Sequence, residues 1–274
     1  MKTLNLTQDG WLEPSNSDIT FSDMPSNYYK LGEVSINLDS NVHKLESLAS
    51  FHIDSRKIQI ASKLSLLQEQ IKHSEFSTVL NTAAIPFFLS HNVSKYSLGE
   101  LVDKVYLPTL RDKITKEYPS RYVKFSSQGG ETQTEGSIVS SNIGQYEGLL
   151  NMLATASIVG IYCPLVLEGY SPSSQRNAYA RMSNHSLKGT QLCLSGPLEI
   201  LSSLTFNPDM LANPDSYSHV LCASGVECLN KKLSMCIKSY GLNLEVWYLS
   251  NRLTPEIEQV SEQWTGGLTF YTNI

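Results

Sequence analysis

The sequence predicts an α/β protein with a mainly helical N-terminal half and a C-terminal half built on a parallel sheet. Between residues 58 and 71, apolar side chains recur at three- and four-residue steps, as on one face of a helix. Residues 158–167 form an unbroken apolar run, which is typical of a strand buried on both faces. Residues 219–274 alternate short apolar runs with helical patterns, which indicates parallel strands joined by crossover helices.

Composition indicates a globular protein of two domains, or of one domain with a long extension. The chain has 274 residues, of which 41% are hydrophobic, so it can bury a full core. No apolar run approaches the ~20 residues that span a bilayer. The N-terminus lacks the apolar stretch of a secretory signal. We therefore expect a cytoplasmic protein without membrane insertion.

The five cysteines are an odd number, and most lie in apolar runs of the second half. They are Cys163, Cys193, Cys222, Cys228 and Cys236. This pattern predicts buried free thiols in a reducing compartment. Neither the cysteines nor the six histidines have the short spacing of a metal site. We expect no metal and no cofactor.

The first 125 residues are expected to form an arm and a helical domain. Residues 1–38 are polar without sustained periodicity, which indicates an extended arm. Residues 39–125 contain helical patterns at 42–48, 58–71 and 109–118. Ser97 and Glu100 have the spacing of a capping box that begins another helix, and Pro108 is expected to break or kink it.

Residues 135–274 are expected to form the α/β domain, after a turn or linker at Gly129-Gly130. Strands are expected at 137–141, 158–167, 191–194, 219–223, 242–249 and 268–271. Helices are expected at 143–153, from Ser171-Pro172, and from Thr254-Pro255. Ser224 and Glu227 form a second capping-box pattern, which predicts a helix that continues to Tyr240.

The order of these elements resembles the NYN branch of the PIN-like nucleases over about residues 135–274. Ser224-Gly225 after an apolar strand, Gly241, the pair Glu245-Val246 and Asn142 fall in register with the family pattern. The resemblance implies a parallel, Rossmann-like sheet and a site at the carboxyl ends of its strands.

The acidic residues that such nucleases use to bind Mg²⁺ or Mn²⁺ are replaced in this chain. Val226 and Cys228 stand where the resemblance implies two aspartates, and Ser140 or a neighbour stands at a third. Glu199 and Glu227 remain, too few for the usual carboxylate cluster. We therefore expect no enzyme activity, with a metal-dependent ribonuclease using a rearranged site at Glu199 and Glu227 as the alternative.

Three further groups of residues are candidate binding elements. The backbone N–H groups of Ser224 and Gly225 could bind an anion at a strand-to-helix turn. The arm contains Trp11, Phe21, Tyr28 and Tyr29, which we expect to dock on the protein or on a partner, with Trp11 as the strongest anchor. A basic strip interleaved with aromatics could contact RNA; it comprises Arg111, Lys113, Lys116, Arg121 and Lys124.

These observations together predict a non-catalytic scaffold or adaptor subunit of a larger protein assembly. Only eight charged residues lie between Gly136 and Val226, which indicates either a deep core or a surface covered by another protein. The net charge of -5 makes nucleic acid an unfavourable general partner. An RNA-binding protein that uses the basic strip is a second alternative.

Overall fold

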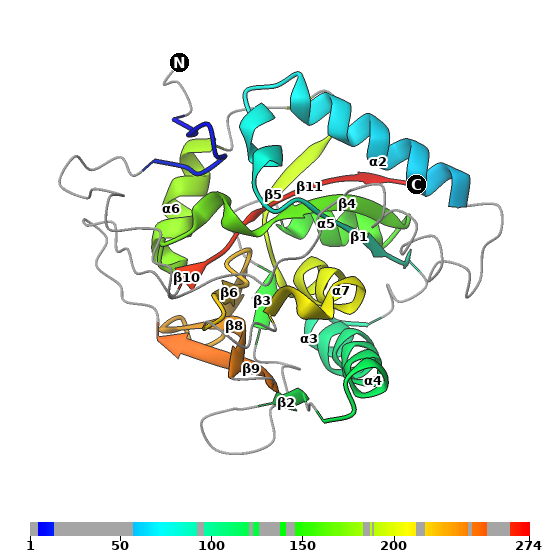
Figure 1. The fold of residues 1–274 in the computed structure, drawn as a ribbon, viewed down its shortest axis with the longest axis vertical. Coiled ribbons are helices and arrows are strands. Elements are labelled where there is room, and N and C mark those ends of the chain that lie inside the picture. Colours follow the sequence, from blue (N-terminus) through cyan, green and yellow to red (C-terminus); the bar gives the residue numbers. More distant parts are fainter. Residues whose placement is uncertain are drawn as a thin grey trace.

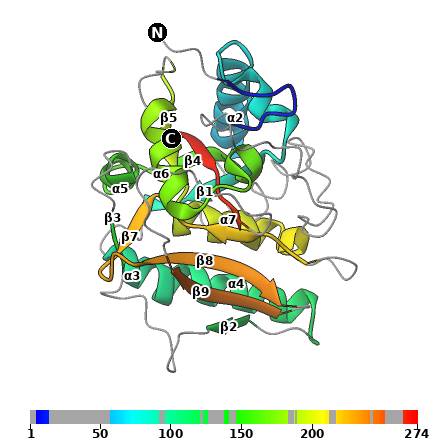
Figure 2. The same cartoon turned by 90° about the vertical axis from the view of Figure 1, so that its left-hand side faces the viewer.

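The computed structural model describes residues 5–13, 57–91, 96–120, 123–125, 138–140, 146–182, 187, 189–211, 217–240, 243–250 and 264–274. The described elements form three sheets and the helices around them (Figures 1 and 2). The first sheet has the strand order β1-β4-β11-β5 and is antiparallel throughout. Its strands are β1 (Ile85–Leu89), β4 (Ile158–Cys163), β11 (Leu268–Asn273) and β5 (Gln191–Leu194).

The first sheet is buried on both faces, because the side chains of β4 alternate between two apolar cores. Ile158 and Tyr162 belong to the core that contains α5 (Tyr146–Leu153) and α7 (Pro197–Phe206). Val159 and Ile161 belong to the core that contains α2 (Lys57–Lys72) and α6 (Pro172–Met182). Figure 1 shows α2 on one side of this sheet and α7 on the other.

The second sheet has the order β10-β6-β8-β9-β2 and mixes parallel and antiparallel pairs. The pairs β10–β6 and β2–β9 are parallel, whereas β6–β8 and β8–β9 are antiparallel. One face packs on the core that contains α7, through Leu221, Met235 and Ile237. Its strands are β10 (Trp264–Thr265), β6 (Val220–Cys222), β8 (Leu233–Tyr240), β9 (Asn243–Ser250) and β2 (Val123–Phe125).

Two short strands and a segmented helix complete the described fold. β3 (Ile138–Ser140) pairs antiparallel with β7 (Val226–Cys228). The chain is helical from α3 (Leu98–Glu100) through the π-helical η4 (Leu101–Tyr106) to α4 (Leu107–Glu117). The short 3-10 helices are η2 (Ser77–Asn81), η5 (Pro164–Leu167) and η6 (Pro208–Leu211).

The capping box at Ser97 is confirmed, whereas the chain does not break at Pro108 but stays helical through it, with a π-helical segment before it. Glu100 N–H donates to Ser97 Oγ at 3.3 Å, and Ser97 N–H donates to a Glu100 carboxylate oxygen at 2.9 Å. Pro108 has no N–H to give to the preceding turn, and η4 ends just before it. The structure also has the helices expected at 58–71, 109–118 and from Pro172, and the strands at 191–194 and 268–271.

The predicted fold class is wrong: the sheets are mostly antiparallel, and the domain is not a parallel, Rossmann-like one. The run at β4 does mark burial on both faces, but helical layers can cover an antiparallel sheet as well as a parallel one. The first half is also less helical than predicted, because β1 and β2 enter the two larger sheets. The prediction missed β1, whose sequence Ile-Pro-Phe-Phe-Leu is short and contains a proline.

The helix predicted from Ser224 to Tyr240 is also wrong, because this segment forms β7 and β8 joined by a turn. Ser224 does not cap a helix; its hydroxyl donates to Gln175 Oε1 at 2.5 Å. Leu233, Met235 and Ile237 lie on the core face with a period of two. Some apolar residues of this segment are also three or four positions apart, and this spacing is what predicts a helix from the sequence. The helices predicted at 42–48 and from Thr254 lie outside the described residues.

Candidate functional site

Glu199 lies at the centre of a buried polar cluster between α7, α5 and the first sheet. Its carboxylate accepts hydrogen bonds from Gly196 N–H at 2.6 Å, Tyr146 Oη at 3.0 Å and Thr269 Oγ1 at 3.1 Å. Thr269 Oγ1 also lies 2.8 Å from Ser195 Oγ. Glu199 has an exposed fraction of 0%. The carboxylate therefore links one helix to another helix and to the central strand β11.

The strand register explains why these side chains converge. In the antiparallel pairing, Tyr162 of β4 and Cys193 of β5 both lie directly opposite Thr269 of β11. Directly paired residues project to the same face of a sheet, which here is the face covered by α7. Pro197 begins α7 immediately after β5, so Glu199 in its first turn is placed over this row.

Burial has the largest effect on the pKa values of Glu199 and Tyr146 in this cluster. It raises the pKa of Glu199 to about 7, and the hydrogen bonds from Gly196, Tyr146 and Thr269 oppose that rise. Burial also raises the pKa of Tyr146 well above its ordinary value, with the Glu199 charge as a second cause. The cluster can therefore exchange one proton near neutrality, at Glu199.

The two glutamates of the predicted nuclease site have different environments. Glu199 is enclosed as described above, whereas Glu227 lies in β7 opposite Val139 and is half-buried. Glu227 raises the pKa of Arg176, against a larger lowering by burial of that guanidinium. Within the described ranges, no group of three or more His, Cys, Asp or Glu side chains is placed to hold a metal ion.

The predicted anion-binding turn at Ser224-Gly225 is used within the fold. Gly225 N–H donates to Ser195 O at 2.9 Å, which joins the turn to the end of β5. Arg176 Nε donates to Ser224 O at 3.0 Å, and another guanidinium nitrogen donates to Val226 O at 2.8 Å. A Cβ atom at Gly225 would lie 2.3 Å from Leu194 O, so only glycine allows this close approach.

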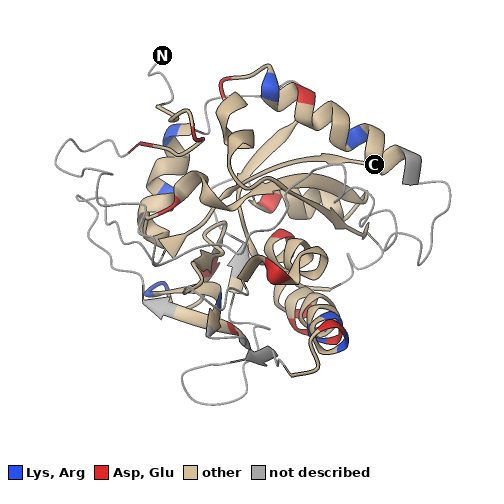
Figure 3. Ribbon diagram, in the orientation of Figure 1, with Lys and Arg blue, Asp and Glu red and all other residues tan. Residues whose placement is uncertain are grey.

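The basic strip lies partly on α4, which carries both charge signs (Figure 3). Arg111 and Lys116 are exposed, and Lys113 forms an ion pair with Glu117 one turn later. Asp112 is exposed beside them. Arg121 and the side chain of Lys124 lie outside the part of the chain that the structure describes. The described part of the strip is a mixed-charge helix face.

The described part of the arm docks through Leu12 more than through Trp11. Leu12 is 4% exposed and lies in the core that contains α2, whereas Trp11 is half-buried. Leu12 N–H donates to Val166 O at 2.9 Å, and Tyr170 Oη donates to Leu12 O at 3.1 Å. Phe21, Tyr28 and Tyr29 lie outside the described residues.

All five cysteines are buried, and none of them is in a disulfide. Burial raises the pKa of Cys222 to about 12, and a hydrogen bond with Gln175 and the Arg176 charge oppose this rise. A thiol with so high a pKa is protonated at neutral pH and is a poor nucleophile. Cys222 therefore acts as a core side chain, packed with Cys236, Val220 and Trp264.

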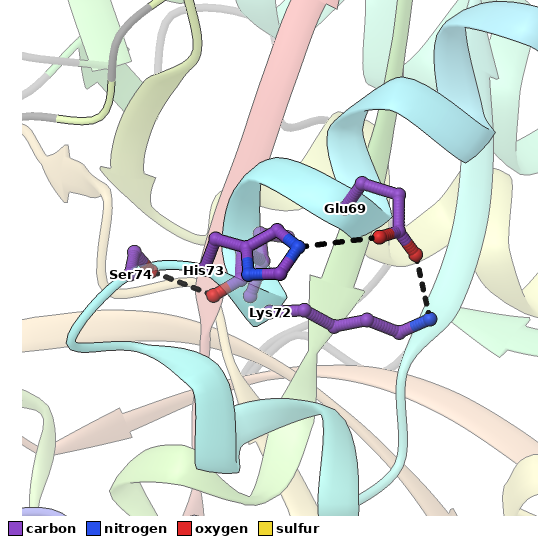
Figure 4. Close-up of polar contacts among 5 residues, drawn as sticks. Glu69, Lys72, His73 and Ser74 are labelled. Atoms are coloured by element: carbon purple, nitrogen blue, oxygen red, sulfur yellow. Dashed lines mark hydrogen bonds and ion pairs between the residues drawn. The ribbon is translucent and has the colours of Figure 1, made fainter.

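A surface group of charged residues lies at the C-terminal end of α2 (Figure 4). Lys72 Nζ lies 2.8 Å from one oxygen of Glu69, and His73 Nε2 lies 3.6 Å from the other. Ser74 Oγ donates to Ile71 O at 2.7 Å and so satisfies a carbonyl at the helix end. These contacts are local ones that stabilise the last turn of a helix.

The turn between β7 and β8 was missed as a surface feature by sequence reasoning. Leu229 is 66% exposed there, although its neighbour Cys228 is buried. Lys231 and Lys232 beside it are exposed. The segment Leu-Asn-Lys-Lys between two apolar runs is a turn signal, whereas the capping-box pattern at Ser224 predicts a helix through it.

No helix in the described part of the chain is long and apolar enough to cross a membrane. No protein-family model, no curated protein and no solved structure matches the chain.

Proposed function

We propose that this protein is a non-catalytic binding subunit of a larger protein assembly, and that it contacts a partner protein through the β7–β8 turn. The observation that carries this proposal is the exposure of Leu229 next to two lysines. Of the described large apolar side chains, Leu229 is more exposed than Leu66 (54%) or Tyr217 (55%). Figure 2 places the turn at an edge of the molecule, beside β3.

The turn is held in a fixed shape by its own hydrogen bonds. Asn230 Oδ1 accepts from Lys232 N–H at 3.1 Å, and Asn230 O accepts from Leu233 N–H at 2.9 Å. The strands on either side are anchored, because Cys228 and Met235 are buried in the main core. A preordered turn loses less conformational entropy on binding than a flexible one.

The chemistry of the turn defines the partner surface that fits it. Leu229 requires an apolar pocket, since burying it there removes apolar area from water. Lys231 and Lys232 favour acidic side chains at the rim of that pocket. The proposed partner is therefore a protein with an apolar pocket bordered by Asp or Glu.

Three polar side chains of α6 and α7 support a binding role over a catalytic one. The carboxylate of Glu199 and the side chains of Gln175 and Arg176 bond to other parts of the fold. Such groups act as connections between elements, since their donors and acceptors are already engaged.

The test compares Leu229→Ser with the matched control Leu66→Ser in the full chain. Leu66 is a similarly exposed leucine, but it lies on α2. In the native cell, the tagged wild type and the Leu66→Ser variant should elute from gel filtration as one complex of fixed stoichiometry. Leu229→Ser should elute as the free chain with an unchanged melting temperature.

A photo-cross-linking residue shows whether position 229 contacts the partner directly or whether Leu229→Ser breaks the complex by an indirect effect. Placed at position 229, it should form a single covalent product with one partner, whereas at position 66 it should form none. Lys231→Ala with Lys232→Ala should slow association and weaken its dependence on salt. If the chain is monomeric in the cell, or if both leucine variants keep the complex intact, the proposal is wrong.

A further inference from the structure

The carboxyl of Glu199 is enclosed, and no cationic side chain of the described residues balances its charge. Its donors are neutral groups, among them Gly196 N–H, Tyr146 Oη and Thr269 Oγ1. Among the residues that the structure describes, no Lys, Arg or His forms an ion pair with it. Burying an uncompensated negative charge is unfavourable, so the environment favours the neutral carboxylic acid.

The cluster can accommodate both protonation states by reversing one hydrogen bond. When Glu199 is ionised, Tyr146 Oη donates to it, at 3.0 Å. When Glu199 is protonated, its own O–H can donate to Tyr146 Oη, which already accepts from Leu198 N–H at 3.3 Å. A phenolic oxygen has two lone pairs and can accept both bonds. The contact between Glu199 and Tyr146 can therefore exist in both protonation states.

The titratable groups that face Glu199 from the surrounding elements are tyrosines and a cysteine, all of which are neutral near pH 7. Burial is the first cause that raises the pKa of each. They are Tyr106 of η4, Tyr146 of α5, Tyr162 of β4, Cys193 of β5 and Tyr271 of β11.

Other charged groups on the elements around α7 lie away from this cluster. β1 contains no titratable residue. Arg111, Asp112 and Lys116 of α4 and Lys104 of η4 are exposed, as is Asp209 of η6. After burial, the charge of Asp103 of η4 is one of the causes that raise the pKa of Tyr248, and Lys113 forms an ion pair with Glu117. Glu199 is thus the group in this part of the core whose charge changes near neutral pH.

We propose that Glu199 is a proton-linked lock, whose protonation tightens the packing of α5 and α7 on the first sheet and whose ionisation loosens it. The direction follows from the complete burial of the carboxyl among neutral donors, which disfavours the ionised form and raises the pKa of Glu199 to about 7 from its ordinary value of 4.5. The folded state then holds a proton that the unfolded chain releases between these two values. The contribution of the Glu199 carboxyl to the free energy of unfolding is fully present below about pH 4.5, and it is lost as the pH rises through about 7.

The first experiment observes the proton itself by infrared difference spectroscopy. The wild type should show the C=O stretch of a protonated carboxylic acid at about pH 6, and this band should disappear with a midpoint near pH 7. Thr269→Val removes one donor to the carboxylate and should move the midpoint upward. Glu199→Gln should lack the band, and Glu147→Gln, at an exposed glutamate of α5, should keep it.

The second experiment measures the consequence by hydrogen exchange, corrected for the intrinsic effect of pH on exchange rates. Amides of residues 146–153 and 197–206 should lose roughly tenfold of their protection between about pH 6 and about pH 8. The same amides in Glu199→Gln should not respond.

The wild-type titration and the Thr269→Val shift do not depend on Glu199→Gln folding. The proposal is overturned if the wild type has no titrating carboxylic-acid band, or if its exchange is independent of pH. It is also overturned if Thr269→Val leaves the midpoint unchanged.

Discussion

Ser202 Oγ of α7 donates to Phe88 O at 3.0 Å and accepts from Phe88 N–H at 3.4 Å. Phe88 lies in β1, the first strand in the order of the antiparallel sheet, where one row of backbone groups has no neighbouring strand among the described residues. One hydroxyl therefore serves both backbone groups of a residue at this edge. Sheet edges left open are sites of intermolecular pairing, and here a helix covers the edge.

Ser202→Ala should destabilise the protein by roughly 1 to 3 kcal/mol, because it leaves the two backbone groups of Phe88 without their side-chain partner. The adjacent Ser203 provides a matched control, since it is equally buried and no described group hydrogen-bonds its hydroxyl. Ser203→Ala should change the free energy of unfolding by less than about 0.5 kcal/mol. Urea unfolding of the three proteins gives the comparison. Equal losses of the free energy of unfolding in both variants would show that Ser202 stabilises the protein by packing alone and not by its hydrogen bonds to Phe88.

Glu199→Gln should remove a pH dependence from global stability. The pKa of Glu199 is about 7 in the folded protein and its ordinary value is 4.5, so ionisation destabilises the folded state as pH rises between them. The free energy of unfolding of the wild type should fall by about 2 to 3 kcal/mol from pH 5 to pH 8, relative to the variant. Urea unfolding at several pH values measures this difference. A constant difference between the two proteins would contradict the prediction.

Gly160→Ala should destabilise the protein by roughly 3 kcal/mol through overpacking. A Cβ atom at Gly160 would lie 2.4 Å from Phe270 O and 2.5 Å from the ring of Phe87, in the middle of the first sheet. Gly148→Ala is the control, because a Cβ atom there meets Tyr271 Oη at 3.3 Å on a helix that favours alanine. Thermal unfolding should place Gly160→Ala well below Gly148→Ala, and similar melting temperatures would contradict this packing.

Leu12→Ala should lower the free energy of unfolding by about 2 kcal/mol or more, and Trp11→Ala should lower it by less. Leu12 is buried against the core that contains α2, while Trp11 is half-buried. Tyr170→Phe removes the donor to Leu12 O and tests the same contact from the other side. Limited proteolysis near residue 13 should accelerate in Leu12→Ala. If Trp11→Ala is the more damaging change, the arm is anchored by its aromatic ring instead.

The sequence predicts several individual elements because their local signals agree with their final packing. The helix at 57–72 presents Leu64, Leu67 and Ile71 to one core, as its periodicity indicates. The capping box at Ser97 forms because both of its hydrogen bonds are local. Such features depend on neighbouring residues alone and can be read without knowledge of the tertiary structure.

The direction of the strands could not be predicted in this way. The apolar run at β4 correctly indicates burial on both faces, but burial does not specify whether the neighbouring strands are parallel. The segment 226–240 failed for a different reason. Its apolar residues fit both helical and strand periods, and the distant Gln175 takes the Ser224 hydroxyl that would have capped a helix.

The candidate site was predictable only in part. The sequence singles out Glu199 as one of two glutamates left for a nuclease-like site, but its partners Tyr146 and Thr269 are 53 and 70 residues away in the chain. Leu229 falls within the helix that the capping-box pattern at Ser224 predicts, so the sequence does not indicate its exposure in a turn. Both features depend on tertiary pairings that single-chain periodicity does not contain.

The place of β11 in the first sheet determines when that sheet can form during synthesis. β11 lies between β4 and β5 and pairs with both, although residues 268–273 are translated after every other strand described. Until they leave the ribosome, β4 and β5 have no strand between them, and the apolar faces around them lack their central contact. Nascent chains of this protein should therefore be prolonged clients of chaperones, with a folding step that waits for a long-range pairing.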